Sequence, residues 1–327
     1  MGRPLTRDGR PVLQLPDDFI ERPWTFRAKQ GEGGVPSASE RRGPLWRRPH
    51  HGVLAWVGSD EDDARQRILA ASAAVDGLPL AGWAAAYLHG ATELDGQAND
   101  GTALPVLFCP GTSGARRPRP GLQPWRSTLE PRDVVQIDRI PCTSLNRTAF
   151  DLARRADSLH DAVADLDVML RSTKLSQPDL AKYIERQGRR WGVVQARGAL
   201  MLLDPFALSR PESRLRVLWV EDAGLPRPLV NAAVYDKVSG RRIGAPDLLD
   251  PESGLAAEYD GDYHWELGQS TADNRRQERL ESLGLTIVRV TALDMHDPAT
   301  LVQRLQEGYL RARRVRRRNW WVPRGGK

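Results

Sequence analysis

The amino-acid sequence predicts an α/β chain, α+β overall, in which a mainly helical half precedes a small α/β domain. In the first half, apolar residues between 145 and 204 recur at the three-to-four spacing of amphipathic helices. From residue 209 onward the pattern becomes helix, three strands, helix, strand, helix, over about 100 residues, a common domain size. No segment repeats with a period of 20 to 50 residues, which argues against a solenoid.

The bulk composition restricts the class of protein. The chain has 327 residues, enough for two or three domains, and a formal net charge of +6. No apolar run reaches the roughly 18 residues that a membrane span needs, and no apolar leader opens the chain. Cys109 and Cys142 are isolated, without the spacing of a zinc site, so we expect free thiols in a reducing cytoplasm.

The elements before residue 145 follow from local signals. Residues 1–45 are rich in Pro, Gly and Arg, which predicts loop for most of this segment. Ser59 or Asp60 is the expected N-cap of a helix over 61–75, because acids follow in its first turn. The other expected elements are strands at 52–58, 104–109 and 134–143 and a helix within 80–91.

Four helices and then the small domain complete the chain. Ser176 with Pro178 just inside is a helix-start signal. The predicted domains are a basic N-terminal segment at 1–58, a mainly helical domain at 59–208, an α/β domain at 209–313 and a basic Arg/Trp tail at 314–327. In the α/β domain we expect helices at 210–225, 271–285 and 298–314 and strands at 229–236, 243–250, 255–261 and 286–291.

A predicted hairpin within the α/β domain gathers three carboxylates. If residues 251–254 form a four-residue loop, Asp250 lies opposite Leu255 and Asp247 lies opposite Glu258. Asp260 then shares their sheet face, because side chains alternate along a strand. Three like charges on one patch repel each other and lose hydration, so the patch needs a cation, a proton or an arginine.

A divalent ion is the favoured explanation of this patch. Carboxylate oxygens are the ligands that Mg²⁺ and Mn²⁺ prefer, so we expect Asp247, Glu258 and Asp260 to bind Mg²⁺ or Mn²⁺. Such an ion activates water for attack on a phosphodiester. A one-residue slip of the register would instead separate the carboxylates, leaving them at a solvated edge or paired with arginines.

Basic residues mixed with tryptophan favour a nucleic-acid partner. Residues 310–327 carry seven arginines and one lysine without an acid, and a second basic cluster surrounds Trp46. Arginine suits phosphate contact and tryptophan suits base stacking, whereas a solvated tail is the plainer alternative. The candidate nucleic-acid-binding residues are Arg47, Arg48, Arg314, Arg316, Arg317, Arg318, Trp320 and Trp321.

The α/β domain resembles the endonuclease-like domain of the very-short-patch-repair (Vsr) type, within the PD-(D/E)xK nuclease superfamily. The resemblance covers residues 209–313. It rests on ESRL at 212–215, PDL at 246–248, AEYDGDYHW at 257–265, the strand TIVRVT, and the series Asp273, Arg276, Leu280 and Gly284. It implies a restriction-endonuclease-like α/β domain with a mixed central sheet.

The same resemblance implies roles for individual residues. Asp247 resembles the metal-binding aspartate of the PD motif, and Glu258 the acid of the (D/E)xK motif. Asp260 stands where the superfamily usually has lysine. Glu212 resembles an acid that ligates a metal-bound water, and a helix cap is its alternative role. The remaining candidates are His264 as a general acid or base, or a surface histidine, and Arg276 as a phosphate contact or ion-pair partner.

The first half resembles the AbiEi-type antitoxin family of abortive-infection systems. The resemblance rests on GLPLAGWAAAYLHGA at 77–91 and IPCTSLNRTAFDLAR at 140–154. Residues 41–57, RRGPLWRRPHHGVLAWV, resemble the end of the wing of a winged helix. Arg147, Thr148 and Asp151 match the family's R-T-x-x-D pattern, and we interpret them as structural.

Two functions therefore compete on the sequence alone. The leading hypothesis is a Mg²⁺-dependent DNA endonuclease or nickase, a hydrolase whose basic segments hold double-stranded DNA. The alternative is a non-enzymatic DNA-binding transcriptional regulator, an antitoxin of a toxin–antitoxin or phage-defence system with a cognate toxin as partner. An RNA-directed nuclease ranks below both. No sequence feature predicts a membrane partner.

Overall fold

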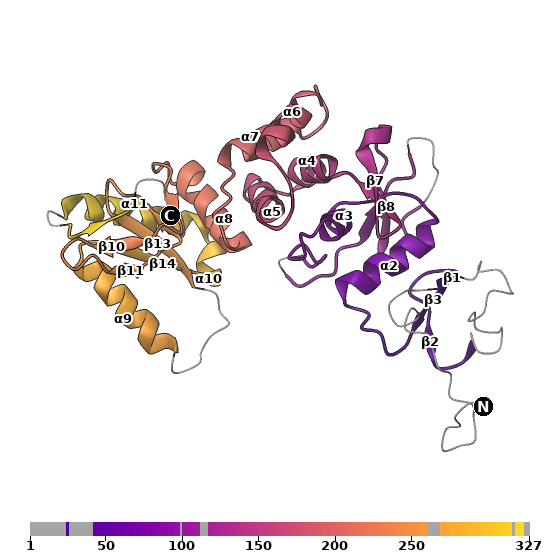
Figure 1. Cartoon of the computed structure of the whole chain (residues 1–327), viewed down its shortest axis with the longest axis horizontal. Coiled ribbons are helices and arrows are strands. Elements are labelled where there is room, and N and C mark those ends of the chain that lie inside the picture. Colours follow the sequence, from indigo (N-terminus) through magenta and orange to yellow (C-terminus); the bar gives the residue numbers. More distant parts are fainter. Residues whose placement is uncertain are drawn as a thin grey trace, which may run out of the picture. The chain divides into compact units, whose positions relative to one another are not determined.

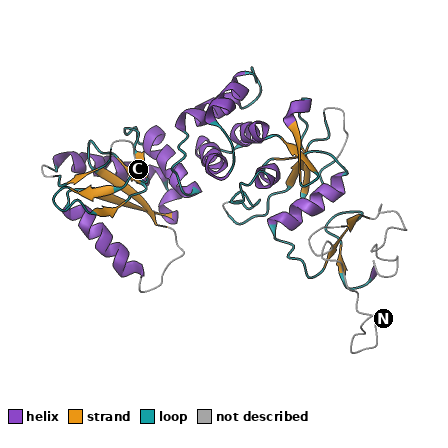
Figure 2. Ribbon diagram, in the orientation of Figure 1, coloured by secondary structure: helices purple, strands orange, loops and turns teal. Residues whose placement is uncertain are grey.

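The computed structural model describes residues 24–25, 42–98, 100–111, 117–260, 269–315 and 318–323. The chain folds as two compact units, residues 1–148 and 149–327, and each is considered by itself. The division falls inside helix α4 (Leu145–Arg155). Figure 1 labels the elements along the chain, and Figure 2 distinguishes helices from strands. The domain boundaries predicted at residues 58, 208 and 313 stay predictions, because this division does not bear on them.

A small antiparallel sheet opens the first unit. Its strands are β1 (Trp24–Thr25), β2 (Trp46–Arg47) and β3 (Val53–Trp56), in the order β1-β3-β2. Strands β2 and β3 form a hairpin in which Trp46 lies opposite Trp56 and Arg47 opposite Ala55. The buried side chains of β3 hold the hairpin against the rest of the unit, so its tip at residues 48–52 projects from a fixed base.

Helix α2 (Ala64–Val75) follows the hairpin and begins later than expected. Its N-cap is Asp63, whose carboxylate accepts a hydrogen bond from the backbone N–H of Gln66, rather than Ser59 or Asp60. Ser59 Oγ instead donates to the carbonyl oxygen of Trp56, at 2.7 Å. The N-cap is therefore the aspartate that directly precedes the first buried helical residue, Ala64.

A five-stranded mixed sheet forms the centre of the first unit. Its order is β6-β5-β4-β8-β7, with helix α3 (Trp83–Leu88) packed against it. The strands are β4 (Leu80–Ala81), β5 (Val106–Phe108), β6 (Leu122–Pro124), β7 (Val134–Ile137) and β8 (Ile140–Thr143), with the 3-10 helix η2 (Pro131–Asp133) before β7. Pairs β4–β8 and β5–β6 are parallel, and the other two pairs are antiparallel.

The buried charged side chains of α4, Arg147 and Asp151, form ion pairs. Arg147 donates to Asp133 at 3.0 Å and to the carbonyl oxygen of Thr128 at 3.0 Å, and its side chain is inaccessible to solvent. Asp151 is also buried and accepts from Arg154 at 2.7 Å. Since a buried ion needs such partners, Arg147, Thr148 and Asp151 serve the fold, as predicted.

Helices α5 to α8 begin the second unit. They are α5 (Leu159–Ser172), α6 (Gln177–Glu185), α7 (Val193–Leu202) and α8 (Arg210–Val217), and a π-helical turn η3 (Leu218–Asp222) extends α8. Ser176 caps α6, and a proline lies in its first turn, as predicted. Trp219 in η3 is fully buried, and its indole N–H donates to the carbonyl oxygen of Pro226 at 2.8 Å.

Ion pairs join α5 to α8 along their length. Asp167 and Arg216, both buried, pair at 2.5 Å. Asp167 also accepts from Ser213 Oγ at 2.7 Å and from the backbone N–H of Asp204 at 2.9 Å. Two further ion pairs, which are partly exposed, flank this one. They are Arg210–Asp165 at 2.6 Å and Arg214–Asp161 at 2.7 Å. The buried carboxylate is therefore compensated on both oxygens.

Two sheets complete the second unit. A mixed sheet has the order β14-β13-β12-β9, and an antiparallel sheet has the order β11-β10-β15. The strands are β9 (Leu229–Val230), β10 (Val234–Asp236), β11 (Arg242–Gly244), β12 (Leu248–Leu249), β13 (Leu255–Asp260), β14 (Thr286–Thr291) and β15 (Trp320–Trp321). The helices are α9 (Gln269–Ser282), α10 (Ala292–Met295) and α11 (Pro298–Arg314).

The mixed sheet buries both faces. Leu255 and Ala257 of β13 pack with α8, η3 and α11, whereas Ala256 packs with Leu280 of α9 and with Trp320. Figure 2 shows α9 and α11 on opposite sides of these strands. The α+β class and the mixed sheet predicted for this region are confirmed.

Two predicted strands of the second unit are each divided in two, as is the predicted strand 134–143 of the first unit, which forms the antiparallel pair β7–β8. Asn231, with a left-handed φ of 49°, separates β9 from β10 within the predicted strand 229–236. Residues 245–247, which include Pro246, separate β11 from β12 within the predicted strand 243–250, and proline lacks the N–H that a ladder needs. The unit therefore holds two sheets where the sequence predicts one. Among the described residues, no helix is long and apolar enough to cross a membrane.

Replacing Arg216 with methionine tests the buried pair of α5 and α8. The change leaves the Asp167 carboxylate buried without its ionic partner, and we expect it to lower the free energy of unfolding by about 3–5 kcal/mol. Denaturant unfolding followed by tryptophan fluorescence measures this loss. The matched control is Lys182→Met, since Lys182 forms an exposed pair with Asp179 at 3.6 Å and should contribute at most about 1 kcal/mol. Equal losses in the two variants would contradict the account.

Candidate functional site

The β12–β13 hairpin places two of the predicted carboxylates on one sheet face. Leu248 lies opposite Ala257 and Leu249 opposite Ala256, and the N–H of Asp250 donates to the carbonyl oxygen of Leu255 at 2.8 Å. This is the predicted register with a loop at 251–254. By extension of that register, Asp247 lies opposite Glu258 on the face that packs against α9.

Asp247 is a carboxyl group with an unusual affinity for its proton. Burial, with the negative charges of Glu212 and Glu258 as smaller contributions, raises the pKa of Asp247 to about 7. A hydrogen bond from the backbone N–H of Tyr259, at 2.6 Å, and the charge of Arg276 act in the opposite direction. Asp247 is therefore poised to gain or lose a proton near neutral pH.

Glu212 joins this cluster from the first turn of α8. Its Oε2 accepts from the backbone N–H of Leu208 and from Asn231 Nδ2, both at 3.0 Å, and its Oε1 accepts from Ser209 Oγ at 2.8 Å. Ser209 is the N-cap of α8. The alternative role of Glu212, stabilising the start of its helix, is therefore one that it performs.

Asn231 connects Glu212 to Asp247, and sequence reasoning missed it. Its side chain donates to Glu212 while its backbone N–H donates to the carbonyl oxygen of Asp247 at 3.0 Å. Asparagine tolerates the left-handed conformation that this position adopts. An Asn inside an apolar run, at 229–236, is the signal in the sequence that points to it.

Arg276 of α9 lies against Glu258. The two side chains form an ion pair at 3.2 Å, and Glu258 is only 8% exposed. Gly244 of β11 makes room for this arginine, since a Cβ there would lie 3.3 Å from Arg276 Cδ. Arg276 therefore supplies the positive charge that the carboxylate patch requires, which is the arginine alternative of the sequence analysis.

The arrangement does not fit the predicted metal site. Asp260 is on the expected face, but its side chain is 62% exposed, 3.8 Å from Arg289. Arg276 occupies the space beside Glu258. Across the described part of the chain, no three Asp, Glu, His or Cys side chains are grouped to hold an ion. The prediction that Asp247, Glu258 and Asp260 share one ion stays a prediction, and His264 lies outside the described residues.

The C-terminal basic residues divide into structural and exposed groups. Trp320 is 5% exposed in the core beside β10, so the predicted base-stacking role of Trp320 is wrong. Arg318 donates to the carbonyl oxygen of Glu252, which ties the tail to the β12–β13 loop. Trp321 stacks on Tyr235 with ring centroids 4.9 Å apart and keeps an exposed face. Arg314 is exposed at the end of α11, and Arg316 and Arg317 lie outside the described residues.

The N-terminal basic residues lie on the β2–β3 hairpin. Arg47 donates to Ser59 Oγ at 3.1 Å and lies 3.8 Å from Glu61, so part of its hydrogen bonding and charge is used within the protein. Arg48 begins the hairpin tip and is exposed. The phosphate contacts predicted for these residues stay predictions.

Replacing Asp247 with asparagine tests the electrostatics of the carboxylate cluster. An aspartate in an unfolded chain titrates near about 3.9, whereas Asp247 holds its proton up to about pH 7. The folded state then binds more protons between these values, so wild type loses stability as pH rises from about 4 to 7. Asparagine abolishes this titration and keeps an acceptor for the Tyr259 N–H.

We therefore expect Asp247→Asn to be more stable than wild type above pH 7, by at most about 4 kcal/mol. Unfolding curves at several pH values measure the difference. Asp236→Asn is the control with the opposite sign, because hydrogen bonds from Ser239 and Val238 lower the pKa of Asp236. If the stability difference between Asp247→Asn and wild type does not change with pH, Asp247 does not have the raised pKa on which this prediction depends.

Comparisons with known proteins show what the central part of the chain is similar to. Residues 80–203, from β4 to just beyond α7, match the model of the AbiEi antitoxin C-terminal domain. Two Mycobacterium tuberculosis proteins, Uncharacterized protein MT2308 of strain CDC 1551 / Oshkosh and Uncharacterized protein Rv2248 of strain H37Rv, are each 30% identical over 269 residues, which is 80% of this chain and 93% of theirs. No solved structure matches. The chain belongs to the same family as these two mycobacterial proteins, and its central segment is similar to the AbiEi antitoxin C-terminal domain.

Proposed function

We propose that the chain is a DNA-binding regulator of the antitoxin type, acting in a toxin–antitoxin or phage-defence system. The observation that carries this proposal is the match of residues 80–203 to the AbiEi antitoxin C-terminal domain. The proposal places the chain in the cytoplasm, with operator DNA and a cognate toxin as its partners.

The chemistry of the N-terminal hairpin supports this proposal. Arg47 and Arg48 lie on a two-stranded hairpin whose tip is held by buried residues of β3. The net charge of +6 attracts a polyanion, and arginines on a fixed hairpin suit contact with the phosphate backbone. Phosphate contact gives affinity without reading sequence, so base recognition requires further residues.

Binding to the DNA upstream of the chain's own gene tests the proposal. We expect tight binding that weakens steeply with salt, because each neutralised phosphate releases counterions. Arg48→Gln should lower the affinity and reduce the slope of log K against log salt concentration by about 0.9 for one lost contact. Fluorescence anisotropy with a labelled duplex measures both quantities.

The matched control is Arg132→Gln, an exposed arginine of the same unit that pairs with Glu130 at 2.7 Å. It should leave the salt slope unchanged. Absence of binding to its own upstream DNA and to random DNA at low salt would refute the regulator proposal. If the two substitutions change the affinity and the salt slope equally, Arg48 does not contact the DNA.

Metal-dependent hydrolysis of DNA is the second candidate. The observation that favours it is the gathering of Glu212, Asp247 and Glu258 within electrostatic reach, in a segment that resembles Vsr-type nucleases. In this candidate, a bound Mg²⁺ would supply an activated water. Arg276 would have to leave Glu258 before a metal could approach, and this requirement ranks the nuclease below the regulator.

A plasmid-cleavage assay with Mg²⁺ or Mn²⁺ tests the second candidate. If the domain is a nuclease, wild type nicks or cuts the plasmid and Glu258→Ala reduces the rate by at least about a hundredfold, as expected for loss of an essential acid. Glu252→Ala, in the loop of the same hairpin, is the matched control and should keep full activity. An inert wild type across metals and DNA forms leaves only the regulator.

A further inference from the structure

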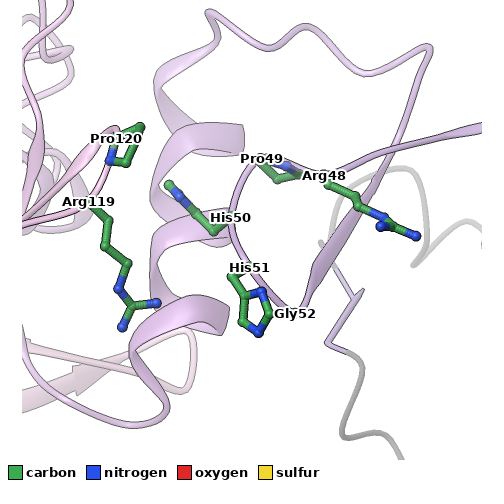
Figure 3. A pocket seen from close by; sticks show the side chains of 7 residues that line it. All are labelled: Arg48, Pro49, His50, His51, Gly52, Arg119 and Pro120. Carbon is green, nitrogen blue, oxygen red and sulfur yellow. The ribbon is translucent and has the colours of Figure 1, made fainter.

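A basic pocket lies beside the tip of the β2–β3 hairpin. The cavity measures about 620 Å³, within the usual range for small-ligand sites. One wall is the hairpin tip and the other is a turn between β5 and β6. The lining residues are Arg48, Pro49, His50, His51, Gly52, Arg119 and Pro120, shown in Figure 3.

The ionisable residues in the described lining are all basic. Figure 3 shows the His50 ring directed toward Pro120, the Arg119 side chain extending from the same turn as Pro120, and the His51 ring below His50. The Arg48 side chain extends away from these groups, toward the outer side of the hairpin. Among the described residues that line the cavity, none carries a carboxylate. The described lining therefore offers hydrogen-bond donors and positive charge.

The titration of His50 reflects the same concentration of positive charge. Burial lowers the pKa of His50, and the charge of Arg119 lowers it further. An anion held between the two groups would act in the opposite direction, because it favours the protonated ring and offsets the charge of the guanidinium. The lining is thus better suited to an anionic ligand than to water alone.

Both walls are built to hold these groups in place. The N–H of Val53 donates to the carbonyl oxygen of His50 at 3.0 Å, which closes the hairpin tip. Arg119 and Leu122 exchange two backbone hydrogen bonds, at 2.9 and 3.0 Å. Gly121, with a φ of 69°, lets the turn approach His50, since a Cβ there would lie 3.4 Å from His50 Cε1. These bonds fix the backbone that carries the donors, which lowers the entropy lost when an anion binds.

We propose that this pocket binds a phosphate group. Arg119 supplies a planar pair of N–H donors, which matches phosphate oxygens, and His50 and His51 supply further N–H donors. The phosphate belongs either to a free nucleotide or to the backbone of DNA, and the chemistry at the pocket is the same for both. The proposal does not depend on operator recognition, since a free phosphate compound satisfies the pocket equally.

Titration of the full chain with three probes tests the proposal. The probes are pyrophosphate, adenosine monophosphate and a short random-sequence duplex, followed by calorimetry and by the imidazole NMR signals of His50 and His51. At least one probe should bind and shift both signals. Arg119→Gln should weaken that binding by about tenfold, as expected for loss of charge-assisted hydrogen bonds. Arg132→Gln, exposed elsewhere in the same unit, should change it less than about twofold.

His50→Gln is a second variant, with a thermal unfolding scan on each protein to establish that it is folded. It keeps much of the ring's volume and should weaken binding severalfold. Binding of pyrophosphate or the mononucleotide identifies a free phosphate compound as a ligand, and binding of the duplex alone identifies the DNA backbone. Both results support the pocket if Arg119→Gln is selectively impaired.

The other outcomes overturn the proposal. If no probe binds, or if none shifts the two histidine signals, the pocket is not a phosphate site. If the duplex binds but Arg119→Gln and Arg132→Gln weaken it equally, the DNA-binding function stands and the pocket does not. If pyrophosphate binds selectively while no DNA binds, the pocket stands and the regulator proposal fails.

Discussion

The buried ion pair between Asp167 of α5 and Arg216 of α8 is the constraint on which the second unit depends. Neither ion tolerates burial alone, so α8 must face α5 at one register and depth. That same placement carries Glu212, in the first turn of α8, to the edge of the mixed sheet. A structural pair in the helical segment therefore determines where the acid of the candidate site lies.

The negative charges of the carboxylate cluster, Glu212, Asp247 and Glu258, require compensation. Burial and neighbouring acids raise the pKa of Asp247. Arg276 balances the charge of Glu258 through their ion pair. Asn231 satisfies Glu212 and the backbone of Asp247 together. A proton on Asp247, the guanidinium of Arg276 and the amide of Asn231 can therefore balance the cluster without a metal ion. The cluster is compatible with an electrostatically balanced scaffold in a DNA-binding regulator, the function we propose.

Local rules predicted much of this arrangement, and tertiary packing decided the rest. The hairpin register followed from the four-residue loop at 251–254, because the loop length decides which residues of the two strands lie opposite one another. The position of Arg276 could not be predicted in that way, since it depends on α9 packing over β11 at Gly244. The composition of the tail favoured nucleic-acid contact, yet Trp320 is buried, because a strand pairing with β10 is a long-range contact that composition does not encode.

The claim that Arg276, rather than a metal ion, balances the cluster separates the two candidate functions most directly. Crystals of the full chain grown with Mn²⁺ allow an anomalous difference map at the manganese edge. The account predicts a guanidinium group beside Glu258 and no manganese peak within the cluster. A manganese ion ligated by both Asp247 and Glu258, with Arg276 displaced, would contradict it and restore the nuclease as the leading function.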